Sequence, residues 1–104
     1  MGHDISGINN AEKVIAYARF SMWNDDASIL YSLLDAEHFD AGVSGIGDMS
    51  TFSIQQIEKA LNTYNQLYVS ESDFLDWDRK QILNFIQNCL ATAQKEGSVR
   101  VYFG

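Results

Sequence analysis

The N-terminal part of the chain alternates apolar and polar residues on both sides of an asparagine pair. The alternation runs from Asp4 to Ile8, Asn9 and Asn10 follow, and it resumes from Glu12 to Phe20. Because asparagine tolerates the left-handed geometry of tight turns, this pattern predicts a β-hairpin. In the second arm, Val14, Ala16, Ala18 and Phe20 share one face, and Ile15, Tyr17 and Arg19 share the other.

A helix capped by Asn10 is the competing interpretation of residues 12–20. Alanine favours helix, and a second set of apolar residues follows helical spacing. This set is Ala11, Val14, Ile15, Ala18 and Met22. Both interpretations stay open from the pattern alone, with the strand preferred.

Two helices with recognisable starts follow. Asn24 and the two aspartates after it supply a capping oxygen and negative charge to a segment that ends near Ala36. After a glycine-containing loop, Ser53 and Gln56 form a capping box at the start of the second helix. The apolar stripes are Ile29, Leu30, Leu33 and Leu34 in the first helix, and Ile54, Ile57, Leu61, Tyr64 and Tyr68 in the second.

A third helix is expected to start at Ser70, which can cap it. The acidic residues Glu71, Asp73, Asp76 and Asp78 crowd its first turns, where the positive end of the helix dipole stabilises negative charge. Lys95 and Gly97 supply a favourable charge and a stop signal. Its buried stripe is Phe74 or Leu75, then Ile82, Phe85 or Ile86, Cys89 and Ala93.

The tail from Ser98 to Phe103 alternates in the way that is typical of a half-buried strand. A single strand cannot satisfy its backbone, and the N-terminal hairpin is the other strand-like segment, so the tail is expected to pair with Glu12 to Phe20. The predicted fold class is α+β. A small antiparallel sheet, built from the N-terminal hairpin plus the C-terminal strand, packs against three helices in a single domain, residues 1–104.

Charge and cysteine content narrow the classes of partner. Seven Lys and Arg against fourteen Asp and Glu give a formal charge of −7, which repels phosphate backbones, so no nucleic acid partner is expected. Cys89 is the only cysteine, which favours a reducing compartment. No stretch approaches the ~20 apolar residues that span a bilayer, so the expectation is a cytoplasmic protein without membrane contact. Cys89, Trp23 and Trp77 are expected to be buried.

The stretch from Glu37 to Thr51 is the best candidate for binding, because it holds Gly42, Gly45 and Gly47 between helix-like segments. The glycine spacing matches neither the dinucleotide fingerprint nor the phosphate loop. The hydrolase elbow around Ser44 lacks its second glycine, so Ser44 has no motif support as a nucleophile.

Asp40 and Asp48 flank this loop and would oppose a phosphate. With Ser44 and loop carbonyls they are oxygen donors that suit a cation such as calcium, although the spacing is not that of an EF-hand. A structural loop whose glycines adopt positive φ is preferred, and no metal ion or cofactor is expected.

Two histidines stand beside acids in the sequence, His3 with Asp4 and His38 with Asp40. If the first strand lies beside the loop, the two pairs would converge as metal ligands or as a base with its orienting carboxylate. That arrangement defines the alternative function, a small metal-dependent or hydrolytic enzyme. Two independent, solvated pairs are the ordinary interpretation.

Three segments resemble a group of small, uncharacterised bacterial and phage proteins. They are Met1-Gly2-His3-Asp4-Ile5, Ile15-Ala16-Tyr17 and the loop Ala41-Gly42-Val43-Ser44-Gly45. The resemblance implies a compact α+β domain with such a loop after a short helix, and it implies no activity.

The function expected from the sequence is a noncatalytic binding or interaction protein with a protein partner, and residues 40–48 are its candidate recognition surface. The candidate binding residues are Asp40, Gly42, Ser44, Gly45, Gly47 and Asp48.

Overall fold

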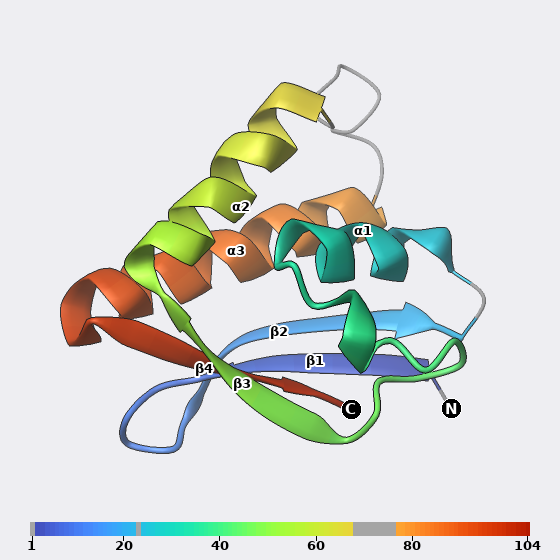
Figure 1. The fold of residues 1–104 in the computed structure, drawn as a ribbon, viewed down its shortest axis with the longest axis horizontal. Coiled ribbons are helices and arrows are strands. Elements are labelled where there is room, and N and C mark those ends of the chain that lie inside the picture. Colours follow the sequence, from blue (N-terminus) through green and yellow to red (C-terminus); the bar gives the residue numbers. More distant parts are fainter. Residues whose placement is uncertain (1, 23, 68–76) are drawn as a thin grey trace.

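The protein consists of a sheet with helices on one face. The computed structural model describes residues 2–22, 24–67 and 77–104, and within them three α-helices cover one side of a four-stranded antiparallel sheet (Figure 1). The elements are β1 Gly2–Ile8, β2 Val14–Ser21, α1 Asp25–Leu33, the 3-10 helix η1 Glu37–Phe39, β3 Asp48–Ser53, α2 Ile54–Leu67, α3 Trp77–Glu96 and β4 Ser98–Phe103. The predicted α+β class is confirmed.

The N-terminal segment forms the predicted hairpin of β1 and β2, so the helical alternative for residues 12–20 is wrong. The side-chain oxygen of Asn9 accepts hydrogen bonds from the backbone N–H groups of Ala11 and Lys13, both at 3.0 Å. The register shifts between Gly7 and Ile8. The β2 residues on the core face are Ala16, Ala18 and Phe20, whereas Val14 beyond the shift is 60% exposed.

The first two helices begin where the sequence predicts. The Asn24 side chain accepts a 2.9 Å hydrogen bond from the Asp26 backbone N–H at the start of α1. At the start of α2, the Ser53 N–H donates to Gln56 Oε1 at 2.8 Å and the Gln56 N–H donates to Ser53 Oγ at 3.2 Å, which completes the capping box.

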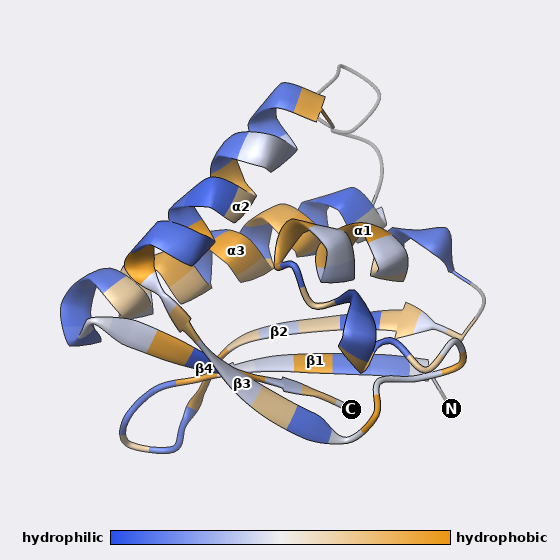
Figure 2. Ribbon diagram, in the orientation of Figure 1, coloured by the Kyte–Doolittle hydropathy of each residue, from blue (hydrophilic) through white to orange (hydrophobic). Residues whose placement is uncertain are grey.

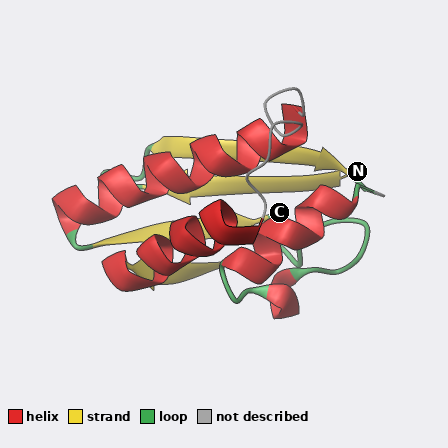
Figure 3. Cartoon of the chain, turned by 90° about the horizontal axis from the view of Figure 1, so that it is seen from above, coloured by secondary structure: helices red, strands yellow, loops and turns green. Residues whose placement is uncertain are grey.

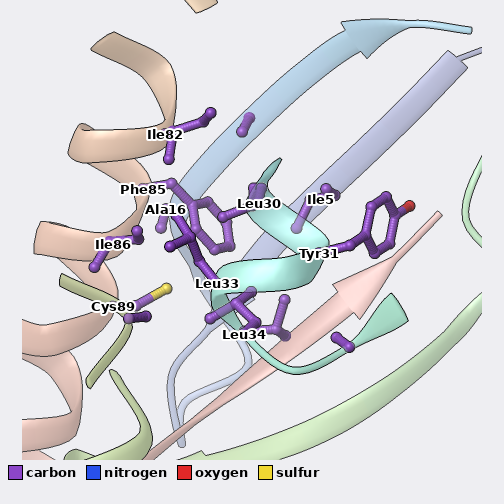
Figure 4. Close-up of a cluster of buried hydrophobic side chains, with 14 of the residues drawn as sticks. Ile5, Ala16, Leu30, Tyr31, Leu33, Leu34, Ile82, Phe85, Ile86 and Cys89 are labelled. Atoms are coloured by element: carbon purple, nitrogen blue, oxygen red, sulfur yellow. The ribbon is translucent and has the colours of Figure 1, made fainter. Parts of the chain in front are cut away.

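The described part of the third helix shows the predicted buried stripe. Ile82, Phe85, Ile86 and Cys89 are completely buried against the sheet and α1 (Figure 4), and Ala93 is completely buried as well. Apolar and polar positions alternate along α2 and α3, as expected for helices with one face buried (Figure 2). The predicted positions Trp23, Tyr68, Ser70, Glu71, Asp73, Phe74, Leu75 and Asp76 lie outside the described residues.

Trp77 is not a core residue, contrary to expectation. It is the first residue of α3, its side chain is 73% exposed, and it lies outside the buried stripe of that helix. No helix in residues 2–22, 24–67 and 77–104 combines the length and the apolar character needed to cross a membrane.

The predicted partner of the C-terminal strand is wrong. β4 pairs with β1 on one side and with β3 on the other, giving the strand order β2-β1-β4-β3, so β2 lies at an edge (Figure 3). The turn after α3 explains this pairing with β3. Gly97 adopts a φ of 91° in the turn, and the chain leaves it with Ser98 opposite Ser53. The strand that follows α3 is thereby registered against the strand that precedes α2.

β3 is not among the strands predicted from the sequence. Five of its six residues are polar or exposed, and only Phe52 is buried, so the segment lacks the hydrophobic alternation that identifies a half-buried strand. As an edge strand it is held by its backbone pairing to β4, which the local sequence does not reveal.

We expect β4 to support the whole domain through its inward face. Replacing the fully buried Phe103 by alanine should lower the free energy of unfolding by about 3–5 kcal/mol, because a large aromatic side chain leaves a cavity. Tyr102→Ala, one residue earlier on the outer face, should cost about 1 kcal/mol or less. Chemical denaturation of both variants measures the difference, and equal losses would contradict this assignment of faces.

Cys89 should be inert in the folded protein. Burial raises the pKa of its thiol to about 12, so at pH 8 almost none of it is the reactive thiolate. A thiol reagent should modify it only as fast as the protein unfolds, and adding denaturant should make the reaction fast. Rapid modification under native conditions would show that the thiol is accessible.

Candidate functional site

The loop of residues 40–48 has a defined backbone conformation. The carboxylate of Asp40 accepts a 2.8 Å hydrogen bond from the Gly42 N–H, and the Ala41 N–H donates to the Ser44 carbonyl at 2.8 Å. Asp40 and Gly45 also form an isolated antiparallel bridge. These bonds close a compact turn, so the loop is ordered by its own backbone as well as by its neighbours.

The second half of the loop is fastened to the end of β4. The Gly45 N–H donates to the Gly104 carbonyl at 2.9 Å, and the Gly47 N–H donates to the Phe103 carbonyl at 2.8 Å. A side chain on Gly45 would place its Cβ 2.5 Å from the Phe103 carbonyl oxygen. Gly45 therefore permits close approach of two backbones, whereas Gly42 and Gly47 adopt positive φ, 92° and 79°, as the sequence predicts for this loop.

The buried side chain of His3 supports the first half of the loop through a hydrogen bond. Its ring is 2% exposed, with Nε2 3.2 Å from the Gly42 carbonyl oxygen and Nδ1 3.0 Å from the Tyr31 hydroxyl. Because a carbonyl only accepts, Nε2 must carry a proton, and in the neutral ring Nδ1 then accepts from Tyr31. The first strand does lie beside the loop, through a buried histidine.

Tyr31 completes this support from α1. Burial, with a smaller contribution from the negative charge of Asp40, raises the pKa of its phenol to about 12, so the hydroxyl keeps its proton and donates to His3. The Tyr31 ring stacks on Phe103 with 5.5 Å between centroids. One tyrosine thus connects the loop's histidine support to the sheet core.

The histidine and acid pairs predicted from the sequence do not form a common site. Asp4 points to the opposite face of β1 from His3, where its carboxylate accepts a hydrogen bond from the Tyr17 hydroxyl and lies 3.6 Å from Arg19 Nε. The exposed His38 ring contacts the Phe39 ring at a tilt of 42°, with 4.2 Å between centroids.

The interpretation of two solvated histidine pairs is also wrong for His3, which is buried. In the part of the chain that the structure describes, no group of three or more His, Cys, Asp or Glu side chains is placed to hold a metal ion. Of the four residues of the enzyme alternative, His3 and Asp40 both hydrogen-bond Gly42, whereas Asp4 contacts Tyr17 and Arg19 and His38 contacts Phe39.

The remaining polar residues of the loop bind backbone. Ser44 Oγ donates to the Gly45 carbonyl at 2.9 Å, and the Asp48 carboxylate accepts from the Met49 N–H at 2.8 Å. The loop exposes one large apolar side chain, Ile46, which is 51% exposed. Ile46 is not among the binding residues predicted from the sequence, although an isoleucine between two loop glycines is a signal that could have identified it.

Comparisons of the chain with protein-family models, with curated proteins and with solved structures find no match.

We expect the His3 and Tyr31 side chains to stabilise the protein as a pair. His3→Phe leaves a buried hydroxyl and the Gly42 carbonyl without their partner, and should lower the free energy of unfolding by about 1–3 kcal/mol. Tyr31→Phe should cost about 1 kcal/mol. The double variant should lose about 1 kcal/mol less than the sum of the two, as measured by denaturation. Strict additivity would show that the hydrogen bond contributes nothing.

Proposed function

We propose that the protein is a noncatalytic binding protein that recognises a protein partner through the loop of residues 40–48. The observation that carries the proposal is the combination of a fixed backbone with an exposed apolar side chain. The loop is fastened to His3 and to the end of β4, yet it presents Ile46 at 51% exposure. A preformed loop binds without a large ordering cost, so rigidity at this position favours recognition.

The charges around Ile46 indicate the chemistry of the partner. The carboxylates of Asp40 and Asp48 each accept a hydrogen bond from a backbone N–H, and an ionised carboxylate can accept several such bonds at once. Exposed Glu37 lies in η1, just before the loop. A partner segment with an apolar side chain flanked by lysine or arginine would complement this surface. Its apolar side chain would contact Ile46, and its basic side chains would lie near the carboxylates.

An enzyme is the weaker candidate because Asp4 lies apart from His3, on the opposite face of β1. His3 bonds the Tyr31 hydroxyl and a backbone carbonyl, so both ring nitrogens are engaged in holding the loop. Ser44 donates to a neighbouring backbone carbonyl in place of a general base.

Site-specific photocrosslinking tests the proposal. A photoreactive phenylalanine analogue at Ile46, expressed in the cells from which the gene comes, should give one dominant adduct of defined mass. The same group at the exposed Gln55 on α2 is the matched control and should not give that adduct. Adding Asp40→Asn and Asp48→Asn should weaken the adduct, because the carboxylates attract the basic flanks of the partner. Identical adducts at both positions, or none at Ile46, would refute the proposal.

Calorimetry with calcium, magnesium and zinc separates binding of a protein from binding of an ion. We expect no stoichiometric binding by the unmodified chain. The double variant Asp40→Asn and Asp48→Asn should keep its fold, because an asparagine oxygen can still accept the Gly42 N–H bond. A tight site for one cation that disappears in the double variant would overturn the proposal in favour of a metal site.

A further inference from the structure

Gln81 of α3 forms two hydrogen bonds with the backbone of one residue of the edge strand β2. Its side-chain oxygen accepts the Arg19 N–H at 3.1 Å, and its side-chain NH2 group donates to the Arg19 carbonyl at 3.0 Å. Because a backbone N–H can only donate, the amide oxygen must be the atom that faces it. A residue of a neighbouring antiparallel strand would make the same two bonds with its own carbonyl and N–H groups.

The register of the sheet explains why the backbone groups of Arg19 are available. The N–H and the carbonyl of Asp4 on β1 are bonded to Gly104, which follows β4, at 3.1 and 2.8 Å. Asp4 lies opposite Arg19, so this pair makes no bonds between β1 and β2, and the Arg19 backbone groups point to the open side of β2. By the same alternation, the backbone groups of Tyr17 and Ser21 also point outward.

Gln81 interrupts the free edge of β2 at its middle outward residue. An added strand bonds to alternate residues, so it needs two successive outward residues with free backbone groups. Arg19 is the outward residue between Tyr17 and Ser21, and beyond Tyr17 the register shift near the hairpin turn ends the regular alternation. The regular part of this edge, every residue of which is described, therefore keeps no two successive outward residues open.

The opposite edge of the sheet shows a related arrangement. The N–H groups of Met49, Thr51 and Ser53 on β3 point away from β4, because the β4 residues opposite them turn their own groups toward β1. The Met49 N–H donates to the Asp48 carboxylate, and the Ser53 N–H donates to Gln56 Oε1, both at 2.8 Å. Side chains thus occupy outward N–H groups at both edges, and on β3 the occupied groups stand on either side of Thr51.

We infer that Gln81 closes the β2 edge against a further strand and so prevents the chain from pairing with its own copies. The strand that it excludes is β2 of a second copy. Two such strands can pair antiparallel about Ala18, which places Tyr17 of one copy opposite Arg19 of the other and forms four backbone hydrogen bonds. Each arginine then faces a tyrosine, so no like charges oppose this pairing directly. This role of Gln81 does not depend on the loop of residues 40–48.

Amide hydrogen exchange of the unmodified chain, measured by NMR, is the first test and does not depend on any variant folding. After correction for the intrinsic rates, the Arg19 N–H should exchange at least about tenfold more slowly than the Tyr17 N–H, because Gln81 holds the first and the second points to the open edge. Equal protection of these two outward amides would overturn the inference.

Gln81→Ala tests the closure at the level of single amides. The Arg19 N–H should exchange at least about tenfold faster than in the unmodified chain, whereas the N–H groups of Ala18 and Phe20, which face β1, should keep their rates. Gln87→Ala, at an exposed position of the same helix, is the matched control and should leave the Arg19 rate unchanged. A uniform increase at all three amides would show a general loss of stability and would contradict a specific role.

Concentration dependence shows whether the opened edge pairs. In about 0.3 M salt, which screens the formal charge of −7, the Tyr17 and Arg19 amide signals of Gln81→Ala should shift between about 0.1 and 2 mM. The dissociation constant should be about 1 mM, because four hydrogen bonds of modest net strength hold the pair. The unmodified chain and Gln87→Ala should show no such shifts. Constant signals in Gln81→Ala, or equal shifts in all three proteins, would overturn the inference.

Discussion

The packing of Phe103 is the interaction on which the rest of the structure depends. Its ring stacks on Phe39 with 4.6 Å between centroids, on Tyr31 at 5.5 Å, and meets Phe52 edge-on at 6.3 Å. These partners come from η1, α1 and β3, which are separated along the chain. The Phe103 carbonyl also accepts the Gly47 N–H, so one residue unites the helical layer, the sheet and the loop.

The same residue explains why the loop is rigid although it is rich in glycine. Glycine ordinarily increases backbone freedom, which disfavours order. Here the N–H groups of Gly45 and Gly47 donate hydrogen bonds to two carbonyls at the end of β4, and the Gly42 carbonyl accepts one from His3. These bonds restrict the backbone at all three glycines. Each glycine is present because a neighbouring backbone or a positive φ requires it, and rigidity follows from the contacts that the missing side chains permit.

The features predicted correctly from the sequence are those set by local chemistry. Asn9 makes the hairpin turn, Ser53 and Gln56 make the capping box, and the stripe around Phe85 follows from helical spacing. The errors concern partners distant in sequence. β3 has too few apolar residues to be recognised as a strand from the sequence. Without β3, the hairpin was the only predicted partner for the C-terminal strand. The support of the loop by His3 joins residues 39 positions apart, which no local pattern encodes.

The position of β4 between β1 and β3 also has a consequence for folding kinetics. β4 is synthesised after both strands that flank it, so the central pairings of the sheet close long stretches of chain and form late. Because the loop takes its shape from Phe103 and Gly104, it cannot be structured before these pairings exist. The surface around Ile46 is therefore presented by completely folded molecules and withheld by partly folded ones.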